Sequence, residues 1–291
     1  KGRNIGQIVL NDTRIKGVVF TGSCETAKKI QNDLVKREGE IIPFMAETGG
    51  LNFMIIDSSA LTEQVVDDAI ESGFNAAGQR CSALRILAIQ DEVYDKTLKM
   101  LIGATKKIKI GLPNLLSTDI GPVIDQEAKD RINNHVKSFK SKVLSQSPLE
   151  SKYQGYYVTP TIIEIESLNE VKEEIFGPVI HVYKYKSNEI EKLISDINKM
   201  NYGLTLGIQS RIENTINYIF NNASVGNIYI NRNIVGAVVG VQPFGGRGLS
   251  GTGPKAGGPN YLLKFANEKS YSYNTTAAGG NATLFMMSEN Q

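Results

Sequence analysis

The chain is organised around one stretch, Phe74-Asn75-Ala76-Ala77-Gly78-Gln79-Arg80-Cys81-Ser82-Ala83, which joins a predicted helix to a predicted strand. Before it, residues 63–74 place apolar side chains at helical spacing, and after it residues 84–90 have the composition of a buried strand. Strands and helices alternate in this way along most of the chain. We therefore predict an α/β fold in which a helix leads into a loop that carries a cysteine.

Cys81 is one of two cysteines in the chain, and small residues surround it. A thiolate nucleophile needs open space on its attack side and donors for the charge that develops on the substrate. Gly78, Ser82 and Ala83 supply that space. The alternative is that Cys81 is a small buried apolar side chain, as free cysteines usually are. The stretch alone leaves both interpretations open.

Composition bounds the class of protein. The 291 residues are 41% hydrophobic, which is enough for one large or two moderate domains with a substantial core. Lys and Arg number 32 against 30 Asp and Glu, and this balance gives no electrostatic reason to expect a nucleic acid or an anionic membrane as partner. Cys24 and Cys81 form neither a metal-ligand pattern nor a disulfide framework, so we expect no metal and a cytoplasmic, reducing location. No stretch approaches a transmembrane span, and a start at Lys1 is expected for part of a longer chain.

The N-terminal region contains a generic anion-binding turn. Residues 17–21 form a short apolar strand that runs into Gly22 and Ser23, and Ser23 can cap a helix over residues 25–35. Backbone N–H groups at a helix N-terminus favour phosphate. Many such turns bind nothing, and the chain lacks the Gly-Lys-Ser/Thr of a P-loop.

Glu47 precedes a Gly49-Gly50 elbow between two apolar runs, residues 41–46 and 52–56. A carboxyl group placed there is partly desolvated, and desolvation raises its pKa toward the range of a general base. The alternative is a solvated glutamate at the end of a strand.

Two later segments present loops of unusual composition. Glu173-Glu174-Ile175-Phe176-Gly177-Pro178 places a carboxylate and an aromatic ring at a loop edge, or is a helix end closed by Gly-Pro. Residues 241–253 contain glycines at the GxGxxG spacing, but Pro254 forbids the helix that a dinucleotide fingerprint requires. We interpret this glycine loop as one that lays backbone amides against an anionic group, or as a flexible crossing.

Three structural expectations complete the pattern. Ser59 or Thr62 is expected to cap the helix over residues 63–74. His135 is expected on the solvated face of a polar helix, and His181 is expected to be a structural residue of a strand.

Five motifs, taken together and in order, resemble the aldehyde dehydrogenase superfamily. They are Phe20-Thr21-Gly22-Ser23, Glu47-Thr48-Gly49-Gly50, Gly78-Gln79-Arg80-Cys81, Glu174-Ile175-Phe176-Gly177-Pro178 and Pro243-Phe244-Gly245-Gly246. Essentially all 291 residues are similar to the L-glutamate γ-semialdehyde (1-pyrroline-5-carboxylate) dehydrogenase part of bacterial bifunctional proline-utilisation proteins. The resemblance implies NAD-dependent oxidation of L-glutamate γ-semialdehyde to L-glutamate in proline catabolism.

The resemblance also implies roles for individual residues. Cys81 is the expected nucleophile, which forms a thiohemiacetal and then a thioester, and Glu47 is the expected base that activates water for hydrolysis. The expected NAD-binding residues are Gly22, Ser23, Glu174 and Phe176. The expected anchor for the substrate carboxylate is Ser82 with the backbone amides of Gly246 and Arg247.

The implied fold has three parts. Residues 1–48 form the end of a Rossmann-like cofactor domain. Residues 49–265 form a catalytic domain, a parallel-rich sheet with helices on both faces, and its glycine loop 240–258 returns to the domain interface. Residues 266–291 form a C-terminal arm that either mediates assembly into a homo-oligomer or is disordered.

Some parts of the family pattern are absent from this sequence. An earlier segment of the family supplies an asparagine to the oxyanion site, and the longer proteins oxidise proline in a separate domain with FAD. Because loss of one oxyanion donor typically lowers the rate about 10²–10³-fold, we expect little or no turnover from these residues alone. The segment that selects NAD or NADP is also absent. Two alternatives stay open, an aldehyde dehydrogenase with a different substrate and a folded scaffold or oligomerisation module without catalysis.

Overall fold

The computed structural model describes residues 2–149, 154–238, 240–274 and 286. The helices are α1 (Gly2–Asn11), α2 (Cys24–Lys36), α3 (Thr62–Phe74), α4 (Asp91–Thr105), α5 (Gln126–Ser138), α6 (Ile190–Lys199) and α7 (Glu213–Asn222). The strands are β1 (Val18–Thr21), β2 (Phe44–Glu47), β3 (Asn52–Ile56), β4 (Leu84–Gln90), β5 (Val143–Gln146), β6 (Thr161–Ile165), β7 (Val179–Tyr185), β8 (Tyr202–Gly203), β9 (Thr205–Gln209), β10 (Asn227–Ile230) and β11 (Arg247–Gly248). The predicted alternation of strands and helices is confirmed.

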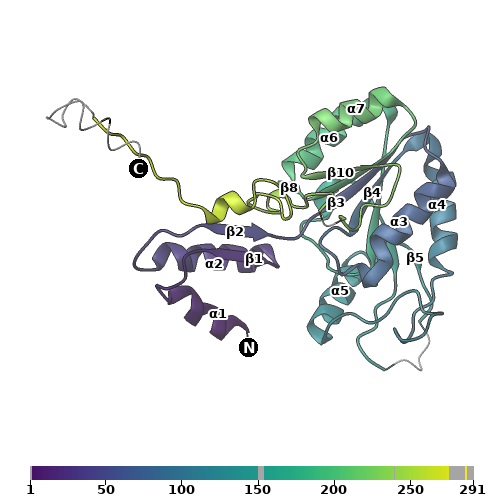
Figure 1. Cartoon of the computed structure of the whole chain (residues 1–291). Helices are drawn as coiled ribbons and strands as arrows, with labels where there is room; N and C mark the ends of the chain where they lie inside the picture. Colours follow the sequence, from purple (N-terminus) through teal and green to yellow (C-terminus); the bar gives the residue numbers. More distant parts are fainter. Residues whose placement is uncertain (1, 150–153, 239, 275–285, 287–291) are drawn as a thin grey trace.

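A seven-stranded sheet in the order β10-β9-β3-β4-β7-β6-β5 forms the larger lobe. Its neighbouring strands are parallel except for β5 and β6, which are antiparallel. Figure 1 shows α3 and α4 on one side of this sheet and α6 and α7 on the other. The predicted parallel-rich sheet between two layers of helices is therefore confirmed.

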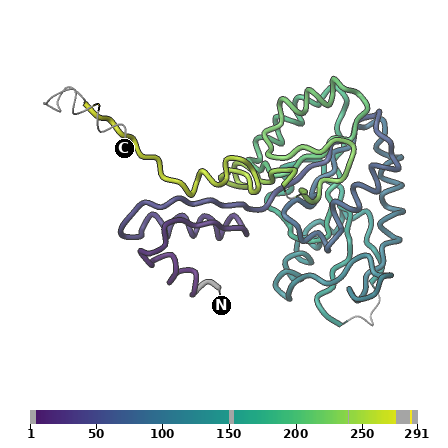
Figure 2. Tube along the Cα trace, viewed as in Figure 1, coloured from purple at the N-terminus to yellow at the C-terminus, as the bar shows by residue number. Residues whose placement is uncertain are grey.

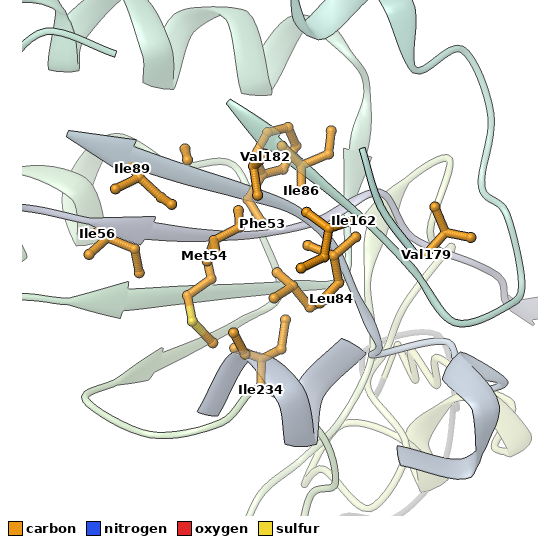
Figure 3. Packing of buried hydrophobic residues seen from close by; sticks show 14 of the residues in the cluster. Phe53, Met54, Ile56, Leu84, Ile86, Ile89, Ile162, Val179, Val182 and Ile234 are labelled. Atoms are coloured by element: carbon orange, nitrogen blue, oxygen red, sulfur yellow. The ribbon is translucent and has the colours of Figure 1, made fainter. Parts of the chain in front are cut away.

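The core of the larger lobe lies along the central strands. Every residue of β3 and of β4 is buried, as expected for strands covered on both faces. Figure 3 shows Phe53 and Met54 of β3 packed among Leu84 and Ile86 of β4, with Ile234 closing one side. This rigid centre supports the loops at the ends of β3, β4 and β7.

The smaller lobe is a two-stranded parallel sheet with two helices. β1 pairs with β2 in a register that sets Thr21 opposite Glu47, and α1 contacts α2 beside them. The expected division between residues 48 and 49 falls between β2 of this sheet and β3 of the larger one. α1 and residues 266–274 lie on the same side of the molecule, away from the seven-stranded sheet (Figure 2).

The glycine loop contacts the end of β2 in the smaller lobe. Thr252 N donates to Ala46 O at 2.9 Å, and Ala46 N donates to Thr252 Oγ1 at 3.0 Å. Glu47 and Gly251 form an antiparallel bridge. Beyond the loop, residues 266–274 are exposed, while 275–285 and 287–291 of the expected arm lie outside the described residues. The role of the arm stays a prediction.

Two local predictions are wrong and one is confirmed. Leu61, without a side-chain cap, precedes α3, because Thr62 is already the first helical residue and is buried. His135 is half-buried rather than solvated, since its Nε2 lies 2.9 Å from Nε2 of the buried His181. Ser23 does cap α2, where its Oγ accepts from Thr26 N.

No helix in the described part of the chain is long and apolar enough to cross a membrane.

Candidate active site

The loop before Cys81 has a backbone that few side chains tolerate. Ala76 and Ala77 both have φ of 54°, and Gly78 follows with φ of 65°. These values lie in the left-handed region, which glycine adopts freely and alanine adopts at a cost. A Cβ on Gly78 would also collide with the carbonyl oxygen of Gly177. The run therefore turns the chain sharply and sets the cysteine loop directly against the segment that precedes β7.

Side chains from the central strands hold the loop around Cys81. Asn52, at the start of β3, is 1% exposed, and its Nδ2 donates to Cys81 O at 2.7 Å and to Ala83 O at 2.9 Å. Thr205 Oγ1, at the start of β9, donates to Ser82 O at 3.3 Å. The loop is fixed through its carbonyl groups, so its geometry depends on the sheet beneath it.

Cys81 and Ser82 line a cavity of about 550 Å³. Arg80 and Gln242 are among the polar residues at its wall, and Gly236 and Ala237 face it from the segment after β10. Because Arg80 is exposed, its cation can meet a ligand that enters from solvent. Neither Gly246 nor Arg247 lines this cavity, so the structure does not bring them together with Ser82. The sequence analysis did not identify Arg80, Gly236 or Ala237 as residues of the site. Arg80 could have been identified, because it directly precedes the cysteine.

Glu47 ends β2 and meets the glycine loop. Its Oε2 accepts from Gly246 N at 3.1 Å. Burial raises the pKa of Glu47 to about 7, and the Gly246 amide and the Lys255 cation oppose that rise. The glycine loop thus lays an amide against an anionic group, and the group is this carboxylate. Arg247 pairs its backbone with Gly203 in the β8–β11 ladder and is exposed.

Glu174 lies against the Gly49-Gly50 elbow. A Cβ on Gly49 would collide with Glu174 Oε2, so only glycine permits this approach. Burial raises the pKa of Glu174, while the cation of Arg85 and the Gly50 amide hold it back. The ring of Phe176 is 43% exposed at the same edge, so the segment is the loop edge rather than the helix end that the sequence left open. A carboxylate and an open aromatic face are therefore available side by side.

Both carboxyl groups, Glu174 and Glu47, raise the pKa of the Cys81 thiol. Its pKa is raised first by burial and then by the negative charge of Glu174, with a smaller contribution from Glu47. The N–H groups of Ser82 and of Cys81 itself act in the opposite direction. The structure thus gathers Cys81, Glu47 and Glu174 at one place, and in this state it favours the protonated thiol.

The start of α2 lies against the glycine loop. The Cys24 thiol donates to Leu249 O of the glycine loop at 2.7 Å. Among the described residues, no group of three or more His, Cys, Asp or Glu could hold a metal ion.

A model of the aldehyde dehydrogenase family matches residues 1–271. The chain belongs to the aldehyde dehydrogenase family. Among curated aldehyde dehydrogenase relatives, it is 51% identical over 280 residues to the bifunctional protein PutA of Klebsiella aerogenes, covering 92% of this chain and 21% of that protein. It is 34% identical over 278 residues to a 1-pyrroline-5-carboxylate dehydrogenase of Bacillus thuringiensis, covering 93% of this chain and 53% of that one.

Solved structures agree with the fold. A variant of Bradyrhizobium japonicum proline utilization A (PutA) has a TM-score of 0.90 and 48% identity, covering 95% of this chain and 28% of that one. A 1-pyrroline-5-carboxylate dehydrogenase from Thermus with bound NAD has a TM-score of 0.84 and 31% identity. The match covers 91% of this chain and 52% of that one. The predicted aldehyde dehydrogenase fold is confirmed, and the chain spans 21% of the length of the PutA relative from Klebsiella aerogenes.

Proposed function

We propose that this protein oxidises L-glutamate γ-semialdehyde to L-glutamate in proline catabolism, with NAD as the oxidant and Cys81 as the nucleophile. The observation that carries the proposal is that Cys81 and Ser82 line one cavity, with the exposed cation of Arg80 at its wall. Two partly buried carboxyl groups, Glu47 and Glu174, act on the same thiol. Membership of the family and the similarity to enzymes of proline catabolism support the choice of reaction.

The chemistry follows from the groups present. The Cys81 sulfur, once deprotonated, adds to the aldehyde carbon and forms a thiohemiacetal. NAD, when bound, accepts the hydride that leaves this carbon. The resulting thioester reacts with water, whose proton passes to Glu47 as the carbon–sulfur bond breaks and the thiolate leaves. A carboxyl group whose pKa is about 7 is suited to this step near neutral pH.

The substrate end of the cavity suits an anionic aldehyde. The carboxylate of glutamate semialdehyde would meet Arg80 and the small residues Ser82, Gly236 and Ala237 of the cavity wall. A guanidinium pairs well with a carboxylate, and glycine allows close approach of backbone N–H groups. We therefore propose these residues as the anchor, in place of Gly246 and Arg247. Ser82 is common to both versions.

The residues present fit NAD at two points. Gly22 and Ser23 open α2, a helix of 13 residues whose N-terminal N–H groups suit a pyrophosphate. Glu174 and Phe176 would hold the nicotinamide ribose through a carboxylate acceptor and an exposed ring. These four residues stay proposals, as does the choice of NAD over NADP.

The intact protein tests the proposal directly. We expect NADH formation from L-glutamate γ-semialdehyde with kcat/KM at least about tenfold above that for an aliphatic aldehyde such as butanal, because only the former carries a carboxylate for Arg80. Cys81→Ala should abolish turnover, and Cys24→Ala is the matched control that should retain it. Equal activity on butanal would indicate a general aldehyde dehydrogenase, and no turnover on any aldehyde would favour a scaffold.

Three finer expectations remain proposals. They are assembly into a homo-oligomer, a cytoplasmic location, and little turnover from these 291 residues alone. The separate FAD-dependent oxidation of proline belongs to the same proposal for the longer relatives.

A further inference from the structure

Arg85 is a buried cation that lies beneath the candidate site. It belongs to β4, shortly after Cys81, and its side chain is only 1% exposed. A charged side chain is almost never buried to this extent unless it is paired and hydrogen-bonded. The groups that surround the guanidinium therefore indicate why it is there.

Arg85 donates to two separate loops. Its Nη2 donates to Gly78 O at 2.9 Å and to Arg80 O at 3.1 Å, in the loop that leads to the nucleophile. The same nitrogen lies 3.4 Å from Glu174 Oε1, and Nη1 donates to Gly177 O at 3.0 Å. The two N–H bonds of Nη2 thus serve three acceptors. A movement of the Glu174 carboxylate must change how strongly the two carbonyls are held.

Neighbouring rings keep the guanidinium in place. The ring of Phe176 covers it, with 5.6 Å from the guanidinium carbon to the ring centroid. The backbone oxygen of Arg85 accepts from Nδ1 of the buried His181 at 3.0 Å, which fixes the strand beneath. The link between the two loops is therefore rigid at both the backbone and the side chain.

We propose that Arg85 is a positioning residue that couples the Cys81 loop to the Glu174 segment, so that contact between Glu174 and a bound nicotinamide cofactor also sets the place of the nucleophile. The inference rests on the proposed function, in which Glu174 faces the cofactor and Cys81 attacks the aldehyde. Lysine cannot replace Arg85 in this role. Its ammonium is a point charge on a flexible stem, whereas the planar guanidinium spans both loops at once.

Hydrogen–deuterium exchange in the intact protein tests the coupling. Arg85→Lys should speed exchange in peptides covering residues 76–83 and 174–178 by about tenfold, since a hydrogen bond to a charged group is lost on each side. Glu174→Gln should speed exchange over residues 76–83 as well, because it leaves Arg85 as a buried cation without a counter-charge. Glu173→Gln is the matched control. Glu173 pairs with the exposed Arg131, so residues 76–83 should exchange at the wild-type rate.

Steady-state kinetics add a readout that a merely structural role would not move. Arg85→Lys, assayed well below its melting temperature, should lower kcat and also raise the KM for NAD, each about tenfold. Asn52→Ala should lower kcat alone, because Asn52 holds Cys81 O and Ala83 O without reaching the Glu174 segment. Lys199→Met, which removes an exposed cation that pairs with Asp196 on α6, should leave both constants unchanged.

The outcomes separate this inference from the proposed function. An unchanged KM for NAD in Arg85→Lys, or equal exchange over residues 76–83 in Glu174→Gln and Glu173→Gln, overturns the coupling while wild-type activity stands. If Arg85→Lys does not fold, the two glutamate variants decide the matter by exchange. If the wild-type protein oxidises no aldehyde, the proposed function fails and the exchange results still decide whether Arg85 couples the loops.

Discussion

The charged forms that catalysis needs at the candidate site are disfavoured by the surroundings of the same residues. A thiolate and an ionised base are both needed, yet the negative charges of Glu174 and Glu47 disfavour the Cys81 thiolate, and burial disfavours the ionised form of all three groups. The Ser82 N–H group lowers the pKa of Cys81, and the Gly246 N–H group lowers the pKa of Glu47, so each offsets part of the rise. The pH dependence of each step should therefore reveal which group titrates.

We predict that the rate of thioester hydrolysis rises with pH and that the midpoint of this rise lies near pH 7. Burial raises the pKa of Glu47 to about 7, so the carboxyl is protonated and inactive as a base below that pH and ionised above it. Glu47→Gln should slow hydrolysis about 10²–10⁴-fold and remove the inflection. Rapid-mixing assays with mass detection of the acylated Cys81 peptide provide the measurement. Glu40→Gln, an exposed carboxyl before the same strand, should keep the wild-type profile.

We also predict that Cys81 in the absence of cofactor is a slow thiol. Since burial and Glu174 raise its pKa, alkylation by iodoacetamide at neutral pH should be slower than that of a peptide cysteine and should climb as the pH rises. Glu174→Gln removes a negative charge and should speed alkylation about three- to tenfold. Peptide mapping distinguishes Cys81 from Cys24. A rate unaffected by Glu174→Gln, or shared by Glu173→Gln, would contradict this account.

Among the elements, those with a strong local pattern could be predicted from sequence. β4 has the bounds that its apolar run predicts, because a strand buried on both faces needs no information beyond its own composition. Residues 202–209, by contrast, form two strands, β8 and β9, which belong to different sheets. That division depends on β11, some 40 residues later, and cannot be seen in the local pattern.

For the candidate site as well, the residues with a clear local signal could be predicted from the sequence and the others could not. Cys81, Glu47 and Glu174 stand out by residue type and neighbouring glycines, and the structure gathers all three. Arg85 could not be found, because within an apolar strand an arginine does not reveal whether it faces solvent or a set of buried carbonyls. The amide of Gly246 was expected at the substrate and instead donates to Glu47 across the fold. Such pairings arise only from tertiary contact.

At the turn before the nucleophile we predict a strict requirement for glycine. Gly78→Ala should lower the free energy of unfolding by roughly 3 kcal/mol or more, because it combines a positive φ with a collision against Gly177 O. Gly103→Ala is the matched control. Gly103 is an exposed residue of α4 with open space at its Cβ position, so alanine should stabilise the helix by about 0.5–1 kcal/mol. Urea unfolding of both variants measures the difference.

For the whole molecule, the paired histidines should make the fold sensitive to mild acid. His181 donates from Nδ1 to a carbonyl, so its Nε2 accepts from His135 and the pair is held neutral. Burial lowers the pKa of His181 to about 3, with the neighbouring His135 adding to the effect, and burial lowers the pKa of His135 as well. A protonated imidazole is therefore more stable in the unfolded chain.

We predict that this linkage removes stability as the pH falls below about 6.5. The unfolded chain then binds protons that the folded chain excludes, so stability is complete above that pH and falls by roughly 2 kcal/mol by pH 5. His181→Gln should flatten the slope between pH 6.5 and 5. Because Glu47 contributes in the opposite direction, the difference between variant and wild type in urea unfolding is the quantity to compare. Identical slopes would show that His181 titrates normally.

The hydrogen bond from Gly246 to Glu47 has a consequence for synthesis on the ribosome. Its two residues are separated by 199 positions, so most of the chain must emerge before the amide exists to meet the carboxyl group. The seven-stranded sheet, whose strands end at Ile230, can assemble earlier, with the cysteine already in its loop. The nascent chain would thus have a nearly complete larger lobe while Glu47 still lacks the glycine loop that contacts its carboxyl group. The order of translation would delay reactivity until the glycine loop has been made.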